Sequence, residues 1–191
     1  MRRVVSALLE ALVVSSGHAY EGRPGDGPRA VETATPDHVE LRAGHGVVGD
    51  RYAGHRAHVD AAITIVAAEA LEAVADELGV EPFDPVAARR TVVTRGVDVE
   101  ALRGVDFTLD SGDGPVLLGG RRPAAPCAWM DAVLAPGAHA ALRGRAGVRF
   151  AVLGSGTLRV GPLAVDVPVD LDAARAPFPR RGRSRAQGRA R

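Results

Sequence analysis

Cys127 is the only cysteine in this 191-residue chain and the residue type best suited to chemistry. It follows a Pro-Ala-Ala-Pro segment at 123–126, and the residues after it, 128–134, are typical of a short helix. A thiol at the start of a helix lies near backbone N–H groups, which favour the reactive thiolate. A buried, inert cysteine is the alternative. One cysteine excludes intramolecular disulfides and multi-cysteine zinc or iron–sulfur sites, and a lone thiol suits a reducing compartment.

Arginine supplies the positive charge, because the chain has no lysine. This absence excludes a Schiff-base lysine, a Walker-A lysine and covalent pyridoxal phosphate. Arg89 and Arg90 directly precede a β-branched run at 91–94, and Arg95 follows it. Guanidinium groups at the ends of one short strand could bind a phosphate or a carboxylate. Solvated surface charge is the simpler interpretation for any one arginine, including those that flank the cysteine: Arg121, Arg122, Arg143, Arg145 and Arg149.

Three histidines, His45, His55 and His58, lie around Asp50 in the sequence. Imidazole and carboxylate groups bind zinc, but this spacing matches no zinc motif. We therefore interpret these histidines as polar surface residues.

The charges are unevenly distributed along the chain. Residues 177–191 contain six arginines and no acidic residue, whereas residues 1–176 contain 18 arginines and 23 acidic residues, a net charge of −5. This pattern predicts a disordered basic tail and a mildly acidic folded part, which disfavours nucleic acid as a partner. The apolar run at 4–14 contains Glu10 and is about half as long as a membrane span, so it is interpreted as a buried strand of a soluble, cytoplasmic protein.

The hydrophobic pattern predicts many short strands and one clear helix. Alternating or β-branched residues predict strands at 2–14, 38–42, 63–66 and 91–94. Apolar residues at helical spacing, followed by Gly79, predict a helix at 67–79. A segment rich in Gly and Pro at 17–38 predicts a long surface loop.

Two Gly-containing turns predict hairpins in the second half of the chain. One joins 107–109 to 116–118, and the other joins 148–153 to 157–160 through the Gly-Ser-Gly segment. Short helical segments are predicted at 99–102, 128–134 and 138–142. The fold class is therefore mostly β with helical insertions (α+β), and a β-barrel is the expected architecture.

Several segments, in this order, resemble the MOSC domain, the molybdenum cofactor sulfurase C-terminal domain. They are GVVGDR at 46–51, RRTVVTRGVD at 89–98, PCA at 126–128, RGRAGVR at 143–149 and TLRVG at 157–161. The resemblance covers residues 38–168 and implies a MOSC-type β-barrel there. Residues 1–37 are then an N-terminal strand and a Gly/Pro-rich loop of the same domain.

The resemblance implies a protein that binds the molybdenum cofactor. In the family a single cysteine binds molybdenum as a thiolate or carries sulfur as a persulfide, and related stand-alone proteins reduce N-hydroxylated bases and amidoximes. By this resemblance Cys127 is the catalytic residue and metal ligand, while Arg89, Arg90, Thr91 and Arg149 bind the cofactor. Thr91 stands where the family often has asparagine. The implied partners are a small-molecule substrate or cofactor and an electron-donor or sulfur-donor protein. A membrane is not an expected partner.

Two other functions fit the same residues. In a sulfur carrier or cofactor-delivery protein, Cys127 would hold a persulfide, and another protein would supply the sulfur because a pyridoxal phosphate desulfurase needs a lysine. In a degenerate barrel, the chain would bind only a partner or an anion. Thr91 favours this last function, as does the segment at 52–58, which stands where many members have His-Gly-Gly.

Overall fold

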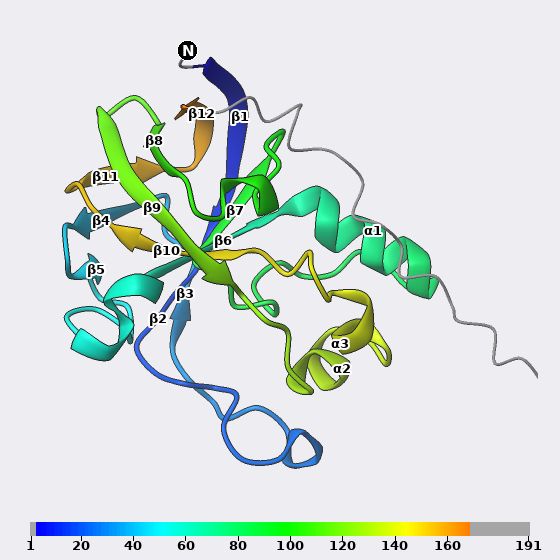
Figure 1. Ribbon diagram of the computed structural model, residues 1–191. Coiled ribbons are helices and arrows are strands. Elements are labelled where there is room, and N and C mark those ends of the chain that lie inside the picture. Colours follow the sequence, from blue (N-terminus) through cyan, green and yellow to red (C-terminus); the bar gives the residue numbers. More distant parts are fainter. Residues whose placement is uncertain (1–2, 169–191) are drawn as a thin grey trace, which may run out of the picture.

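The short strands close into a barrel, as the sequence pattern predicted (Figure 1). The computed structural model describes residues 3–168. Within this part of the chain the strands are β1 (Arg3–Leu12), β2 (Val14–Ser15), β3 (Thr33–Ala34), β4 (His38–Arg42), β5 (Gly46–Val47), β6 (Ile63–Ala67), β7 (Val92–Arg95), β8 (Asp106–Asp110), β9 (Pro115–Pro123), β10 (Val148–Val152), β11 (Gly156–Arg159) and β12 (Gly161–Val167). The helices are α1 (Ala68–Leu78), α2 (Trp129–Val133) and α3 (Ala138–Ala141), with 3-10 turns η1 (Pro24–Asp26), η2 (Arg56–Ala61) and η3 (Glu100–Leu102). The α+β class with a β-barrel is confirmed.

The barrel has the strand order β1-β12-β8-β9-β10-β6-β7, and β7 pairs back onto β1. Its neighbouring strands are antiparallel except β6 and β7, which are parallel and joined by α1. Strand β1 forms two pairings along its length, with a register shift between Leu9 and Ala11 against β7. This shift falls at Glu10, the residue that interrupts the apolar run, and the Glu10 carboxylate is paired with Arg95.

Two hydrophobic cores lie on opposite sides of the barrel wall. Inside the barrel, Phe107 and Phe150 meet edge to face with ring centroids 5.4 Å apart. Outside it, α1, α2 and α3 pack on the outer faces of β6 and β7. Because side chains alternate along a strand, Ile65 of β6 points into the barrel and Val66 points into the outer core. The same alternation decides which residues of β6 can reach a site on the outer wall.

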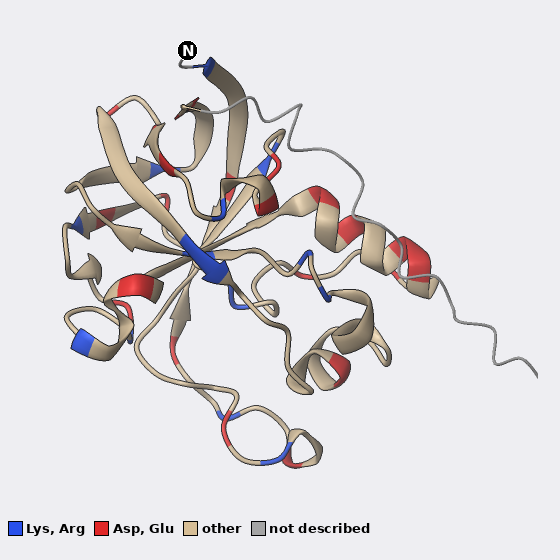
Figure 2. Ribbon diagram, in the orientation of Figure 1, with Lys and Arg blue, Asp and Glu red and all other residues tan. Residues whose placement is uncertain are grey.

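The helix predicted at 67–79 is confirmed as α1. Its apolar stripe, including Leu71 and Val74, is buried in the outer core. Gly79 ends the helix with a left-handed φ of 66°, and its N–H bonds to the backbone oxygens of Ala75 and Asp76. Acidic residues follow one another along the exposed side of α1 (Figure 2). No helix in residues 3–168 is long and apolar enough to cross a membrane.

One of the two predicted hairpins forms and the other does not. Strands β8 and β9 pair around the turn at 111–114, as predicted. Strand β10 pairs with β6 and β9, whereas β11 pairs with β4, so the predicted hairpin between 148–153 and 157–160 is wrong. The Gly-Ser-Gly segment leads the chain out of the barrel into a second sheet, β11-β4-β5. The predicted tail at 177–191 lies outside the described residues.

Gly147, just before β10, is a position where only glycine fits. Its φ is +93°, and a Cβ there would lie 2.2 Å from the backbone oxygen of Ile65. We expect Gly147→Ala to lower the free energy of unfolding by about 2 kcal/mol or more, because steric overlap adds to backbone strain. The matched control is Gly104→Ala, which has a φ of +77° but no atom within 4 Å of the added Cβ. Urea denaturation that gives equal losses for both variants would contradict this prediction.

Candidate functional site: an arginine-lined pocket on the barrel wall

The candidate site lies on the outer face of the barrel where β6 meets β10. Ile63 and Ile65 of β6 point into the barrel core, so Thr64 between them faces outward. On β10 the same alternation turns Arg149 outward, and the strand register places Arg149 directly opposite Thr64. Two polar side chains therefore stand together on an otherwise apolar stretch of wall.

Loops from other parts of the chain close a small pocket over these two residues. The cavity has a volume of about 60 Å³ and is lined by Arg51, Tyr52, His58, Ala61, Thr64, Arg89, Arg90, Ala124 and Arg149. Four guanidinium groups and one imidazole thus face a space into which no carboxylate of the described residues projects. Guanidinium groups gathered in this way attract an oxyanion, and the volume suits one small group such as phosphate.

Arg90 is the most firmly held of these arginines. Its Nε donates to the backbone oxygen of Ala146 at 2.8 Å, Nη1 donates to that of Ala88 at 3.1 Å, and Nη2 donates to that of Ala124 at 3.4 Å. Burial lowers the pKa of Arg90 to about 10, and the nearby charge of Arg149 acts in the same direction. Arg90 therefore remains charged at neutral pH and joins three chain segments at the back of the pocket.

Arg89 ties the long loop between β2 and β3 to the barrel. Its Nη2 donates to the backbone oxygen of Gly17 at 2.9 Å, and its Nη1 donates to Oγ1 of Thr33 at 3.2 Å. Its guanidinium carbon lies 5.4 Å from the ring centroid of Tyr20. Among the described residues, Arg89 is the one non-glycine residue with a positive φ, 51°. Arg89 therefore both lines the pocket and holds its covering loop.

Arg51 is oriented by its neighbour Asp50. The Asp50 carboxylate is buried and lies 3.5 Å from Nη1 of Arg51, and it also accepts the backbone N–H of Tyr52 at 3.0 Å. The guanidinium carbon of Arg51 lies 4.6 Å from the ring centroid of Tyr52. Nε of Arg51 is buried and makes no hydrogen bond within residues 3–168. A buried donor without an acceptor is costly, so the described residues leave part of the hydrogen bonding of Arg51 unsatisfied.

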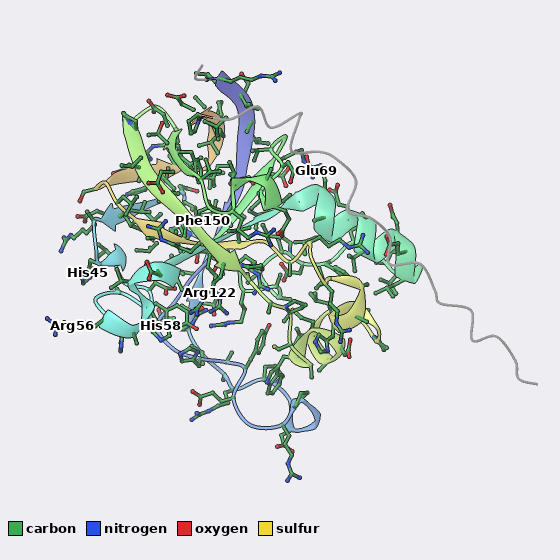
Figure 3. The ribbon with its side chains drawn as sticks, viewed as in Figure 1. His45, Arg56, His58, Glu69, Arg122 and Phe150 are labelled. Carbon is green, nitrogen blue, oxygen red and sulfur yellow. The ribbon has the colours of Figure 1, made fainter. Side chains whose placement is uncertain are left out.

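Arg149 and His58 complete the lining of the pocket. The Arg149 side chain makes no hydrogen bond or ion pair with the residues that the structure describes, so its five donors are available. His58, on η2, lies 4.4 Å from Tyr52 between ring centroids. In Figure 3 His58 lies at the lower left of the molecule, beside Arg56 of the same 3-10 turn.

Cys127 lies in the loop between β9 and α2, which begins at the edge of this pocket. It is exposed and unpaired, and its backbone oxygen accepts the N–H of Met130 at 2.9 Å. Ala124, three residues earlier, lines the pocket and binds Arg90. Helix α2 has only five residues, so its N-terminus supplies little positive potential to the thiol.

The structure brings together Arg89, Arg90 and Arg149, which the sequence singled out, but it places Thr91 elsewhere. Oγ1 of Thr91 accepts the backbone N–H of Thr64 at 3.2 Å and does not line the pocket, so Thr91 supports a wall residue. Arg95, at the other end of β7, is bound by carboxylates of Glu10 and Glu72 and is not available to an anion.

Sequence reasoning missed Arg51, Tyr52 and His58 as lining residues. The sequence places Arg51 only in a family motif, and it favours a polar surface role for His58 over a zinc ligand. The described residues contain no group of three His, Cys, Asp or Glu side chains that could hold a metal. The sequence carries one signal for a site on this wall. Thr64 is a polar residue in an apolar strand, and Arg149 alternates with core residues in the strand that pairs with it.

Glu100 supports the pocket from behind. Its Oε1 accepts the N–H of Gly147 at 2.9 Å, next to the Ala146 oxygen that binds Arg90. Burial raises the pKa of Glu100 above its ordinary value, although the hydrogen bond from Gly147 acts in the opposite direction. The partly buried charge of the Glu100 carboxylate therefore destabilises the folded state at neutral pH.

We expect Glu100→Gln to become more stable relative to the native protein as pH rises. The raised pKa means that the folded state binds the Glu100 proton more tightly than the unfolded state does. The stabilisation that this proton gives the native protein is therefore present at low pH and is lost as pH rises through the folded pKa. Glutamine keeps the acceptor for Gly147 without the charge. Tm differences measured from about pH 4 to pH 8 test this. The control is Glu81→Gln at an exposed carboxylate, and an equal rise there would refute the prediction.

The fold and the site together define a class of protein, a β-barrel with an arginine-lined pocket on its outer wall and an exposed, unpaired cysteine in a loop that follows a pocket residue. The chain belongs to the MOSC domain family, whose model matches residues 49–163. No curated protein matches the chain.

Solved structures show the same fold. The YuaD protein from Bacillus subtilis is 20% identical, with a TM-score of 0.66 over 87% of this chain and 99% of that one. YiiM from Geobacillus stearothermophilus is 15% identical, with a TM-score of 0.55 over 83% of this chain and 74% of that one. YiiM from Escherichia coli is 17% identical, with a TM-score of 0.53 over 82% and 69%.

Proposed function

We propose that the protein binds the molybdenum cofactor, with its phosphate in the arginine pocket and its metal at Cys127, and reduces N-hydroxylated compounds. The observation that carries the proposal is the pocket itself, in which Arg51, Arg89, Arg90 and Arg149 surround a phosphate-sized space without a carboxylate among the described lining residues. Membership of the MOSC family supports the same ligand.

The residues present fit this group. Arg149 has unused donors, and the buried Nε of Arg51 has no acceptor within residues 3–168, so a phosphate oxygen would satisfy both. Cys127 supplies an exposed soft sulfur ligand that suits molybdenum. The cavity of about 60 Å³ holds one oxyanion, so the organic part of the cofactor would lie outside it.

When bound, the cofactor supplies a metal that changes oxidation state. The overall reaction takes an N–OH group, two electrons and two protons to an N–H group and water. The electrons come from a donor protein, because no flavin or iron–sulfur motif is recognisable in the sequence. The chain's own residues would orient the ligand: Arg90 and Arg149 would neutralise the phosphate charge, and Cys127 would hold the metal.

Metal analysis of the purified protein from cells supplied with molybdate tests the proposal. We expect stoichiometric molybdenum in the native protein and its loss in Cys127→Ser, with Arg122→Gln as a control at an exposed arginine outside the pocket. Full retention of molybdenum in Cys127→Ser would remove the thiolate ligand from the proposal. No molybdenum in the native protein would overturn the cofactor assignment.

A sulfur carrier is the second candidate, because Cys127 is exposed and unpaired. In that function a desulfurase would transfer one sulfur atom to the thiol as a persulfide. Intact-mass measurement after incubation with a desulfurase and cysteine would show the added sulfur and its removal by a reductant. A protein with molybdenum and no such mass increase would favour the first function.

A further inference from the structure

Tyr20 lies where the segments that form the site meet. Its hydroxyl donates a hydrogen bond to the backbone oxygen of Ala87, which directly precedes Ala88 and the pocket residues Arg89 and Arg90 in the sequence. Its ring stacks on Trp129, with centroids 5.4 Å apart and an angle of 15° between planes. The guanidinium carbon of Arg89 lies 5.4 Å from the same ring. Tyr20 is thus bound both to the segment before β7 and to the start of α2.

The contact with Trp129 is also a contact with the cysteine loop. Trp129 is only 6% exposed and packs in the outer core, so its ring has little freedom to move. Cys127 lies two residues before it, and the Cys127 backbone oxygen is bound to the N–H of Met130 in the same helical turn. A displacement of the Trp129 ring would therefore displace the thiol.

The hydroxyl contact is stable at neutral pH. Burial raises the pKa of Tyr20 above its ordinary value, against the opposing effect of the Arg89 charge. The phenol therefore remains protonated and continues to donate to Ala87. Arg89 in turn binds Gly17 and Thr33 at both ends of the loop that contains Tyr20. The loop is held from its ends and through its central ring.

We propose that Tyr20 is a positioning residue that fixes the Cys127 loop at its distance from the arginine pocket. The proposal rests on the proposed function only in requiring that the pocket and the thiol act on one ligand. Tyr20 itself contacts neither the pocket cavity nor the thiol by hydrogen bond; it acts through Arg89, Ala87 and Trp129.

Selective alkylation of Cys127 tests this directly, since the chain has no other cysteine. Iodoacetate is an anion and iodoacetamide is neutral, so the ratio of their rates reports the cations near the thiol. We expect a ratio above that of a free cysteine peptide, and a fall of about threefold in Tyr20→Leu, which removes the stacked ring. Tyr20→Phe keeps the ring and loses only the bond to Ala87, so its fall is smaller.

A second variant separates positioning by the Tyr20 ring from general loosening of the loop. Val31→Ala, in the same loop and without a ring contact to Trp129, is the matched control and keeps the native ratio. An unchanged ratio in Tyr20→Leu, or a native ratio equal to that of the peptide, overturns the proposal. Because the readout needs no molybdenum, absence of the metal would refute the cofactor assignment while leaving this result intact.

Discussion

Replacing Arg149 with glutamine is expected to weaken binding of inorganic phosphate by about tenfold or more, because the side chain contributes a charge-assisted hydrogen bond. Arg149 makes no side-chain hydrogen bond or ion pair with the described residues, so its removal leaves no protein partner unpaired. Titration calorimetry at fixed, low salt gives the dissociation constants, and Tm should change little.

Arg122→Gln is the matched control for this measurement. Arg122 lies near the end of β9 (Figure 3). Its side chain is exposed, and it is not among the residues that line the pocket. Both substitutions remove one positive charge, so a general charge effect would weaken binding equally in the two variants. Equal affinities of Arg149→Gln and Arg122→Gln would therefore place the anion elsewhere.

Arg90→Ala is expected to lower the free energy of unfolding by about 3 kcal/mol or more, because three backbone oxygens lose their charged donor. For a domain of this size that corresponds to a fall in Tm of about 6 to 12 °C. Arg90→Lys should recover part of the loss, since an ammonium group cannot reproduce a planar fork that reaches Ala88, Ala124 and Ala146 at once.

The control for stability is Arg143→Ala, which removes an exposed arginine from the neighbouring segment. Thermal unfolding with equal shifts for Arg90→Ala and Arg143→Ala would show that Arg90 is not the structural centre of the pocket. The two predictions distinguish the arginines by role: Arg149 serves ligand affinity, and Arg90 serves both affinity and the fold.

Local patterns predicted the local elements. Helix α1, with Gly79 at its end, follows from apolar spacing, and β4 at 38–42 follows from strict alternation. The hairpin at 148–160 was predicted wrongly because a Gly-Ser-Gly turn specifies a change of direction but not a partner. The partner of β11 is β4, with Thr157 opposite Glu40. This pairing joins segments that are far apart in the sequence, so tertiary packing and not the local turn determines it.

The site was predictable in part for the same reason. Arg89 and Arg90 are adjacent in sequence, so their shared position needed no tertiary information. Arg149 joins them only through the register of β10 against β6, and Arg51 only through the turn after β5. Thr91 has the right place in the motif, but its hydroxyl is used by the backbone of β6.

Because the pocket lies on the outer wall, neighbouring residues of one strand contribute to different properties, the packing of the barrel and the surface of the pocket. Along β6, substitutions at Ile63 and Ile65 alter the filling of the barrel, whereas a substitution at Thr64 alters the ligand surface. Substitutions at successive residues of this strand can therefore affect stability and ligand preference almost independently. A library confined to the outward positions that line the pocket, Thr64 and Arg149, would change the pocket and leave both hydrophobic cores unchanged.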